Sequence, residues 1–328
     1  MTFFKSKLLI AAGALMGLAI NPGADLSKSG QARAEFPTKP IKVYVGFKPG
    51  GRTDTVARLV AKYVQENNLL SQPMIIVNKP GAAAANAARD VLGAKPDGHS
   101  ILHWHHQLLI TNAMGVNKIH PQDFTSLGFL GGGSPVWTVR ADSGLNSLAD
   151  LVNKLKAEPE SLLEAIGIGT IPHLMGVQLA AAAGFKTRYI GSGGGADRLA
   201  KLLGKNADIA LFSASEYLRF KPQGVKALVF FGPNRIASLP DVPTTTELGY
   251  DAVWANPNWW LGPKNMDKEA AAKLSSVLKQ AISSKEMIDY FNSKALDPYW
   301  TDGEPAMEQS LKVLDKLKVI VKEQNLGK

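Results

Sequence analysis

The chain of 328 residues contains no cysteine. This absence excludes disulfide bonds, zinc sites built on thiolates and catalysis by a cysteine nucleophile. A run long enough to span a membrane is also missing at the N-terminus, where the apolar stretch from Leu8 to Ile20 is 13 residues long. A helix of that length cannot cross roughly 30 Å of hydrocarbon, which argues against the alternative of a membrane anchor.

The same N-terminal stretch has the order of a secretory signal peptide. Lys5 and Lys7 precede the apolar run, and a polar segment then ends in Ala32-Arg33-Ala34. A basic segment, an apolar segment and a small-x-small site in that order predict export with cleavage after Ala34. Residues 1–34 are therefore expected to be removed from the mature chain.

Strong net charge is absent as well. The formal net charge of +9 falls to +6 without residues 1–34, which carry four basic residues and one aspartate. No basic run interleaved with aromatic residues is present, so the sequence predicts no nucleic-acid surface. With 45% hydrophobic and 20% charged residues, the composition is that of a soluble globular protein long enough for two domains.

A glycine-rich turn, Gly46-Phe47-Lys48-Pro49-Gly50-Gly51-Arg52-Thr53-Asp54, follows an apolar run and precedes an amphipathic one. This order predicts a turn between a first strand and a first helix. The two adjacent glycines allow left-handed backbone and close approach to another molecule, and Thr53 or Asp54 is expected to cap the helix. Unpaired N–H groups at such a helix start favour an anion.

Strands and helices alternate along most of the chain. The expected strands are 41–45, 73–77, 100–104, 136–139, 163–168, 185–190, 207–212 and 227–231. The expected helices are 53–66, 82–94, 148–157, 170–183, 196–203, 244–248, 267–283, 286–293 and 305–324. The alternation predicts an α/β protein of two doubly wound units, the first of them with a parallel sheet.

The C-terminal helices have no strand-rich unit of their own and are expected to pack on the first domain. The predicted domains are 35–133 with 254–328, and 134–253, so the chain crosses between them twice. Two crossings make a hinge, and a hinge between two α/β units makes a ligand cleft.

Two motifs resemble nucleotide-binding patterns. Gly46-x-x-x-x-Gly51-Arg52-Thr53 lacks the lysine of a phosphate loop, and Pro49 removes a backbone donor. Gly191-x-Gly193-x-x-Ala196 satisfies a dinucleotide pattern only because the run is rich in glycine. Both are interpreted as helix starts that bind anions. A Gly-x-Ser-x-Gly elbow is absent, so a hydrolase is unsupported.

Two aromatic clusters leave alternatives open. His103, His105 and His106 could bind a metal, contact a ligand at the end of a strand, or lie on the surface. Trp254 and the pair Trp259-Trp260 could pack in the core or form a wall of the ligand pocket.

Several segments together resemble the tripartite tricarboxylate transporter receptors, also called Bug proteins, from residue 36 to the C-terminus. They are Phe36-Pro37-x-Lys39-Pro40-Ile41, the turn up to Ala57-Arg58, Asn78-Lys79-Pro80-Gly81-Ala82, Pro96-Asp97-Gly98, Gly193-Gly194-Gly195-Ala196, Leu203-Gly204 before Ala207-Asp208, Leu239-Pro240-Asp241-Val242-Pro243-Thr244 and Glu247-x-Gly249-Tyr250.

This resemblance implies a type II periplasmic binding protein that captures a small organic carboxylate and delivers it to integral-membrane permease subunits. A monomer without cofactor, metal or catalytic residue is expected. The resemblance places the ligand on the first turn and on the turns of the second domain. The candidate ligand-binding residues are Phe47, Gly50, Gly51, Arg52, Thr53, Asp54, His105, Gly169, Thr170, Ser192, Gly193, Gly194 and Ser213.

Three departures from the family pattern bear on the ligand. Arg52 stands where a small residue is usual, the three histidines replace small polar residues, and Gly81 is followed by four alanines. Citrate-like, dicarboxylate and aromatic carboxylate ligands all remain compatible. Two other functions also remain open: a periplasmic hydrolase or isomerase with His105 or His173 as base, and a ligand sensor for a membrane signalling protein.

Overall fold

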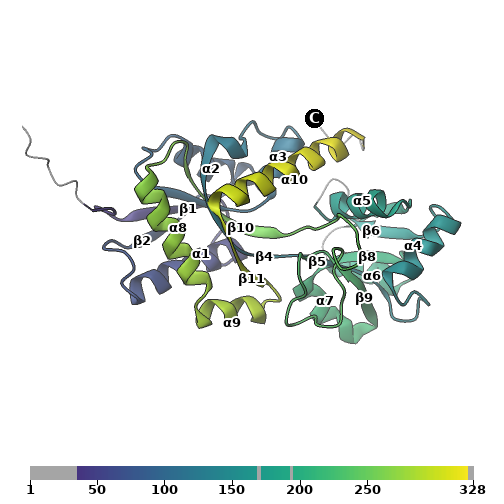
Figure 1. Cartoon of the computed structure of the whole chain (residues 1–328). Helices are drawn as coiled ribbons and strands as arrows, with labels where there is room; N and C mark the ends of the chain where they lie inside the picture. Colours follow the sequence, from purple (N-terminus) through teal and green to yellow (C-terminus); the bar gives the residue numbers. More distant parts are fainter. Residues whose placement is uncertain (1–34, 168–170, 193–194, 324–328) are drawn as a thin grey trace, which may run out of the picture. The chain divides into compact units, whose positions relative to one another are not determined.

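The computed structural model describes residues 35–167, 171–192 and 195–323. The predicted signal peptide and its cleavage position therefore lie outside the described residues. Strands and helices alternate along the described chain and form two β-sheets (Figure 1). The predicted α/β class is confirmed.

The first sheet has six strands in the order β11-β4-β10-β3-β1-β2. Its strands are β1 Ile41–Val45, β2 Met74–Asn78, β3 Ser100–Trp104, β4 Phe124–Gly133, β10 Asn256–Pro263 and β11 Asp297–Asp302. Strands β1, β2 and β3 run parallel, whereas β10 is antiparallel to β3 and β4, and β11 is antiparallel to β4. The sheet is mixed rather than wholly parallel because the C-terminal part of the chain adds two strands to it.

Helices cover both faces of the first sheet. One face carries α1 (Arg52–Glu66), α8 (Lys268–Ile282) and α9 (Lys285–Ser293), as Figure 1 shows. The opposite face carries α2 (Ala85–Leu92), α3 (Gln107–Ala113) and α10 (Gly303–Glu323). The two sets of helices belong to separate hydrophobic clusters, as expected when a sheet lies between them.

The second sheet has five strands in the order β7-β6-β8-β5-β9. Its strands are β5 Pro135–Arg140, β6 Leu163–Ile166, β7 Arg188–Gly191, β8 Ile209–Ser213 and β9 Val225–Phe230. Its helices are α4 Leu148–Ala157, α5 Ile171–Ala183, α6 Gly195–Leu203 and α7 Ala214–Phe220. Strand β5 is antiparallel to β8 and β9, while β6 is parallel to β7 and β8.

The chain passes between the sheets twice. Ser134 is the single residue between β4, which ends at Gly133, and β5, which begins at Pro135. The return path lies between Phe230 and Asn256. Both passages fall where the sequence predicts crossings, and the exact domain bounds, 35–133 with 254–328 and 134–253, stay a prediction.

The alanine-rich helix begins later than predicted. Ala82, Ala83 and Ala84 form a 3₁₀ turn with positive φ angles, and the α-helix starts only at Ala85. A Cβ placed on Gly46 would lie 2.2 Å from the Cβ of Ala84. The alanine turn therefore packs directly against the end of β1. Residues 82–84 form this 3₁₀ turn in place of the first turn of the predicted α-helix.

Strands β4, β10 and β11 and helices α3 and α7 were not expected, and the helix predicted for residues 244–248 is wrong. Strand β10 lies inside the sheet and is buried on both faces, so its sequence lacks the alternation that identifies a half-buried strand. Residues 244–248 form turns instead, and Thr244 N donates to the Glu247 carboxylate at 2.8 Å. A single turn gains too few hydrogen bonds to form a helix by itself.

Glu164 on β6 is fully buried in the second sheet. Trp137 Nε1 donates to its Oε1 at 2.8 Å, whereas Oε2 has no partner among the described residues. Burial raises the pKa of Glu164 to about 8, against the opposing effect of the Trp137 hydrogen bond. The side chain is therefore protonated at neutral pH.

Replacing Glu164 with glutamine should remove a pH-dependent loss of stability. Between about pH 5 and 8 the unfolded wild-type chain releases this proton and the folded chain keeps it, so the wild type loses up to about 1.4 kcal/mol per pH unit. Glu164→Gln cannot ionise and should gain stability relative to the wild type over this range. Urea unfolding at several pH values measures the difference, and parallel stability curves would contradict the prediction.

Candidate functional site

The turn between β1 and α1 presents its glycines to solvent. Gly50 has a φ of 85°, and no atom lies within 4 Å of a Cβ placed on it. Gly51 is the N-cap of α1 and provides no side chain, so the expected cap by Thr53 or Asp54 is wrong. The open glycine turn at a helix start is nevertheless present.

Hydrogen bonds to the side chain of Asp54 fix the conformation of this turn. The buried Asp54 carboxylate accepts hydrogen bonds from Gly50 N and Asn78 Nδ2 at 2.9 Å and from Arg58 Nε at 3.0 Å. Burial alone would raise the pKa of Asp54, but the hydrogen bonds from Arg58, Gly50 and Asn78 outweigh burial and lower it. The carboxylate is thus engaged with the protein, and it shapes the turn.

Arg52 is the first residue of α1 and is half-buried. Its guanidinium donates to the backbone oxygen of Asn256 at 3.2 Å, and no carboxylate pairs with it in the described part of the chain. Burial lowers the pKa of Arg52, an effect that Tyr299 and Tyr290 oppose, yet an arginine stays charged. A partly desolvated cation without an acidic partner is a strong attractor for an anion.

The three histidines lie at the end of β3 and just after it, and the charge of Arg52 acts on His103 and His105. His103 stacks on Trp260 with ring centroids 4.4 Å apart, and His105 stacks on Phe47 at 4.9 Å. Burial and then the charge of Arg52 lower the pKa of His103 to about 3, and burial lowers that of His106 to about 3. The histidines are therefore neutral, and the surface alternative is wrong for His103 and His106, which are buried.

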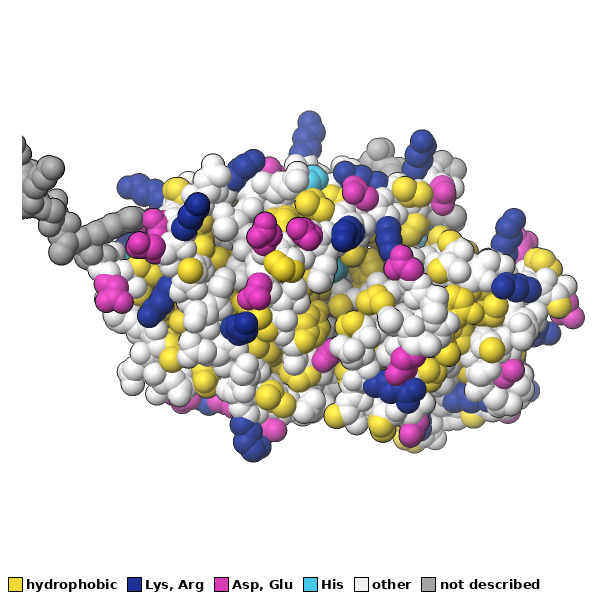
Figure 2. Space-filling model, in the orientation of Figure 1, with side chains coloured by type: hydrophobic (Ala, Val, Ile, Leu, Met, Phe, Trp, Pro, Cys, Tyr) yellow, Lys and Arg dark blue, Asp and Glu magenta, His cyan; other side chains and the backbone are white. Residues whose placement is uncertain are grey.

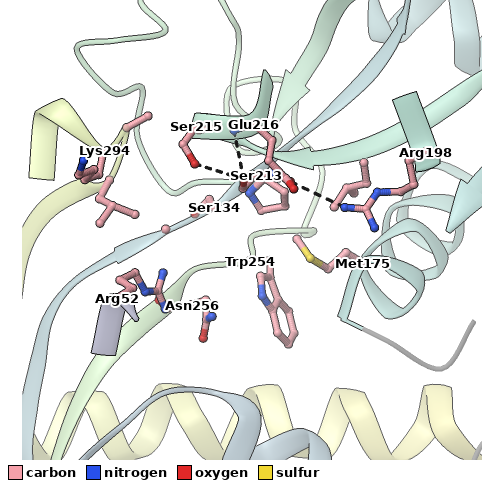
Figure 3. Close-up of a pocket in the computed structure, with 16 residues that line it drawn as sticks. Arg52, Ser134, Met175, Arg198, Ser213, Ser215, Glu216, Trp254, Asn256 and Lys294 are labelled. Carbon is pink, nitrogen blue, oxygen red and sulfur yellow. Dashed lines mark hydrogen bonds and ion pairs between the residues drawn. The ribbon is translucent and has the colours of Figure 1, made fainter. Parts of the chain in front are cut away.

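A cavity of about 350 Å³ lies beside Arg52 (Figure 3). Asn256 and Lys294 line it together with Arg52: Arg52 begins α1, Asn256 begins β10 and Lys294 follows α9. Arg198 and Glu216, on helices of the second sheet, line it as well. Residues attached to both sheets thus surround one cavity.

The charged residues around the cavity favour an anion. Arg52, Arg198 and Lys294 contribute three positive charges and Glu216 one negative charge, a formal excess of +2 among the described lining residues. The guanidinium of Arg198 lies 3.7 Å from the carboxylate of Glu216, so the opposite charges of these two side chains largely cancel. The uncompensated positive charge is therefore on the side of Arg52 and Lys294.

Asn256 has an unused hydrogen-bond donor in the lining of the cavity. Its Oδ1 accepts from His106 N at 3.2 Å, while its Nδ2 donates to no described residue. Trp254 also lines the cavity, but its Nε1 is shielded from solvent and has no partner among the described residues. A charged oxygen of a ligand would be held by Asn256 Nδ2 together with Arg52.

Residues 56–326 match the sequence pattern of a protein family described as the tripartite tricarboxylate transporter family receptor. This match covers most of the chain. The chain belongs to the tripartite tricarboxylate transporter receptor family. A UPF0065 protein from Bordetella pertussis is 30% identical to the receptor over 80% of this chain and 83% of its own length.

Solved structures share the fold of the receptor. A TctC solute-binding protein from Polaromonas is 25% identical, with a TM-score of 0.80 over 88% of this chain and 99% of that chain. MatC from Rhodopseudomonas palustris, solved with bound malate, is 22% identical with a TM-score of 0.60 over 87% of this chain and 100% of its own. The predicted two-domain binding-protein fold is confirmed by these neighbours.

The structure brings together some of the predicted site residues of the receptor. Arg52 and Ser213 line the cavity, whereas the other described candidates do not. Those others are Phe47, Gly50, Gly51, Thr53, Asp54, His105 and Ser192. The predicted residues Gly169, Thr170, Gly193 and Gly194 lie outside the described residues. Ligand contact by any of these candidates stays a prediction.

Among the charged and amide side chains that line the cavity, four escaped the sequence prediction: Arg198, Glu216, Asn256 and Lys294. Ser213 and Glu216 form a capping box, a pattern of spacing three that was visible in the sequence. The others carry no local pattern. Of the tryptophans, Trp254 lines the cavity, while Trp259 and Trp260 are fully buried in the core.

In the described ranges, no group of three or more histidine, cysteine, aspartate or glutamate side chains could hold a metal ion. None of the helices in these ranges combines the length and apolar character that crossing a bilayer requires.

Replacing Asp54 with asparagine should destabilise the receptor, because the charged acceptor of three hydrogen bonds is lost. We expect a cost of about 2 kcal/mol near pH 6. The pKa of Asp54 is depressed, so its contribution is present above about pH 4 to 5 and is lost as the pH falls through its folded pKa. Chemical unfolding at pH 6 and pH 3 measures this cost, which should shrink at pH 3.

Asp315→Asn is the matched control, because Asp315 is exposed and forms no ion pair with the described residues. An equal loss of stability in both variants, or a cost for Asp54→Asn that does not depend on pH, would contradict this role of the Asp54 network.

Proposed function

We propose that the receptor binds a small organic carboxylate in this cavity and delivers it to the integral-membrane permease subunits of a tripartite tricarboxylate transporter. The observation that carries the proposal is Arg52, a half-buried cation that has no carboxylate partner among the described residues. Family membership supports transport, and MatC, which has the same fold, holds malate.

The surface supports a small-molecule ligand rather than a polyanion. Figure 2 shows acidic and basic side chains interspersed over the face in view, without a large patch of one sign among the described residues. The attraction for an anion is instead concentrated in the cavity, where solvent screening is weaker than on the surface.

We propose that the receptor acts as a monomer.

Removing the guanidinium should weaken carboxylate binding. A hydrogen bond to a charged group contributes about 1.5 to 3 kcal/mol, so Arg52→Ala should raise the dissociation constant roughly 10-fold to 150-fold. The ligand is first found by a thermal-shift screen of aliphatic, hydroxylated and aromatic carboxylates. Calorimetry with the best compound then compares Arg52→Ala with the wild type.

Arg219→Ala is the matched control for this experiment. Arg219 is an exposed arginine on α7 that does not line the cavity, so its loss removes the same charge elsewhere. The control should bind within about twofold of the wild type. Equal weakening in the two variants would show a general charge effect, and unchanged binding in Arg52→Ala would overturn the proposed site.

We also propose that the receptor performs no catalysis on its ligand. Neither His105 nor His173, the bases considered for an enzyme, lines the cavity. Liquid chromatography coupled to mass spectrometry of the ligand, after the calorimetry samples are incubated overnight, tests this, because an isomer has the same mass and is separated by its retention time. A receptor returns the compound unchanged, whereas a shift in mass or a new isomer would favour an enzyme.

Export to the periplasm is proposed from the order of basic, apolar and small residues in segment 1–34. Expression in a Gram-negative host should give a periplasmic protein whose intact mass corresponds to a chain that starts at Glu35. A full-length product retained in the cytoplasm would contradict the proposed export.

A further inference from the structure

Glu216 occupies the wall of the cavity that belongs to the second sheet (Figure 3). It is held in place by Ser213: Ser213 N and Oγ each donate to Glu216 Oε2 at 3.0 Å, and Glu216 N donates back to Ser213 Oγ at 3.2 Å. This reciprocal capping box fixes the carboxylate on the first turn of α7. Its position does not depend on a ligand.

The second oxygen of Glu216 is unused. Oε1 accepts no hydrogen bond from the described residues, and the side chain is 28% exposed. A Cβ on Gly195 would lie 2.2 Å from Oε1, so the carboxylate also sits tightly against the start of α6. Arg198 lies 3.7 Å from Oε2, too far for a short charge-assisted hydrogen bond. Glu216 is therefore a fixed acceptor in the lining of the cavity, with Oε1 beside the start of α6.

The two walls of the cavity thus differ in chemistry. One presents donors and uncompensated positive charge, through Arg52, Asn256 and Lys294. The other presents the acceptor of Glu216, with the guanidinium of Arg198 at 3.7 Å and the hydroxyl of Ser215, which lies 3.3 Å from Ser213 Oγ. Between them, Met175, Leu211 and Trp254 provide apolar surface.

We propose that the cavity selects a monocarboxylate whose opposite end carries a hydrogen-bond donor, such as a hydroxyl or ammonium group, and that Glu216 determines this specificity. This inference rests on the proposed function, since it requires that Arg52 holds the carboxylate. A donor at the far end satisfies Oε1 of Glu216. A second carboxylate at that end offers no hydrogen to Oε1 and meets the like charge of Glu216, which Arg198 offsets at 3.7 Å only in part, so it binds less tightly.

Two series of matched acids test the selection by calorimetry. The first is hexanoate, 6-aminohexanoate and adipate, which share a chain of six carbons and differ only at the far end. The second is benzoate, 4-(aminomethyl)benzoate and terephthalate, which vary the same end on a rigid ring. In the series that fits the cavity, the amino acid should bind at least 10-fold more tightly than the dicarboxylate.

Glu216→Gln should reduce or reverse this preference, because the amide keeps the size of the side chain without its charge. The ratio of dissociation constants between dicarboxylate and amino acid should fall at least 10-fold. Glu308→Gln, an exposed position on α10 outside the cavity, is the matched control and should keep the wild-type ratio. The thermal unfolding midpoint of each variant verifies that it is folded.

The outcomes separate this inference from the proposed function. A wild-type preference for adipate or terephthalate overturns the inference while supporting a carboxylate receptor. A preference for the amino acids that Glu216→Gln leaves unchanged overturns the role of Glu216. If the wild type binds none of the six acids, the inference is overturned, while the wider carboxylate screen decides the proposed function separately. The wild-type series decides the selection even if Glu216→Gln does not fold.

Discussion

The desolvation of Arg52 is the constraint on which the site depends. A guanidinium at the first position of α1 loses part of its hydration and receives only a backbone oxygen and two tyrosines in return. In the described protein no carboxylate offsets that loss, so an anion in the cavity would restore the balance. The lowered pKa values of His103 and His105 follow from the same environment, because a second buried cation next to Arg52 would be costly.

The fold positions this cation through a small number of rigid contacts. Asp54 ties Gly50, Arg58 and Asn78 together beneath the turn, so α1 starts at a fixed place relative to β1 and β2. The opposite wall uses the same principle, since Ser213 and Glu216 fix the start of α7 at the end of β8. Each wall of the cavity is thus a helix start that follows a strand, held by a buried or capping carboxylate.

The short passage between the sheets brings these walls together. Ser134 alone separates β4 from β5, and it lines the cavity next to residues from both sides. The unused donors of Trp254 and Asn256 lie on the return path and the start of β10. A cavity built on the two passages is the expected place for a ligand whose binding couples the two sheets.

Sequence by itself determined the α/β class, the helix over residues 148–157 and the glycine turn before α1, because these features depend on neighbours along the chain. It did not reveal β4, β10 and β11, which are recognised as strands only through their pairing with one another and with β3. Arg198, Asn256 and Lys294 come together from distant segments without a local pattern, and the Ser213–Glu216 spacing indicates a helix cap but not a place in the cavity. Tertiary structure alone decided that Asp54 supports the turn from within and that an acidic group faces Arg52 across the cavity, since burial and charge balance arise only when those segments pack.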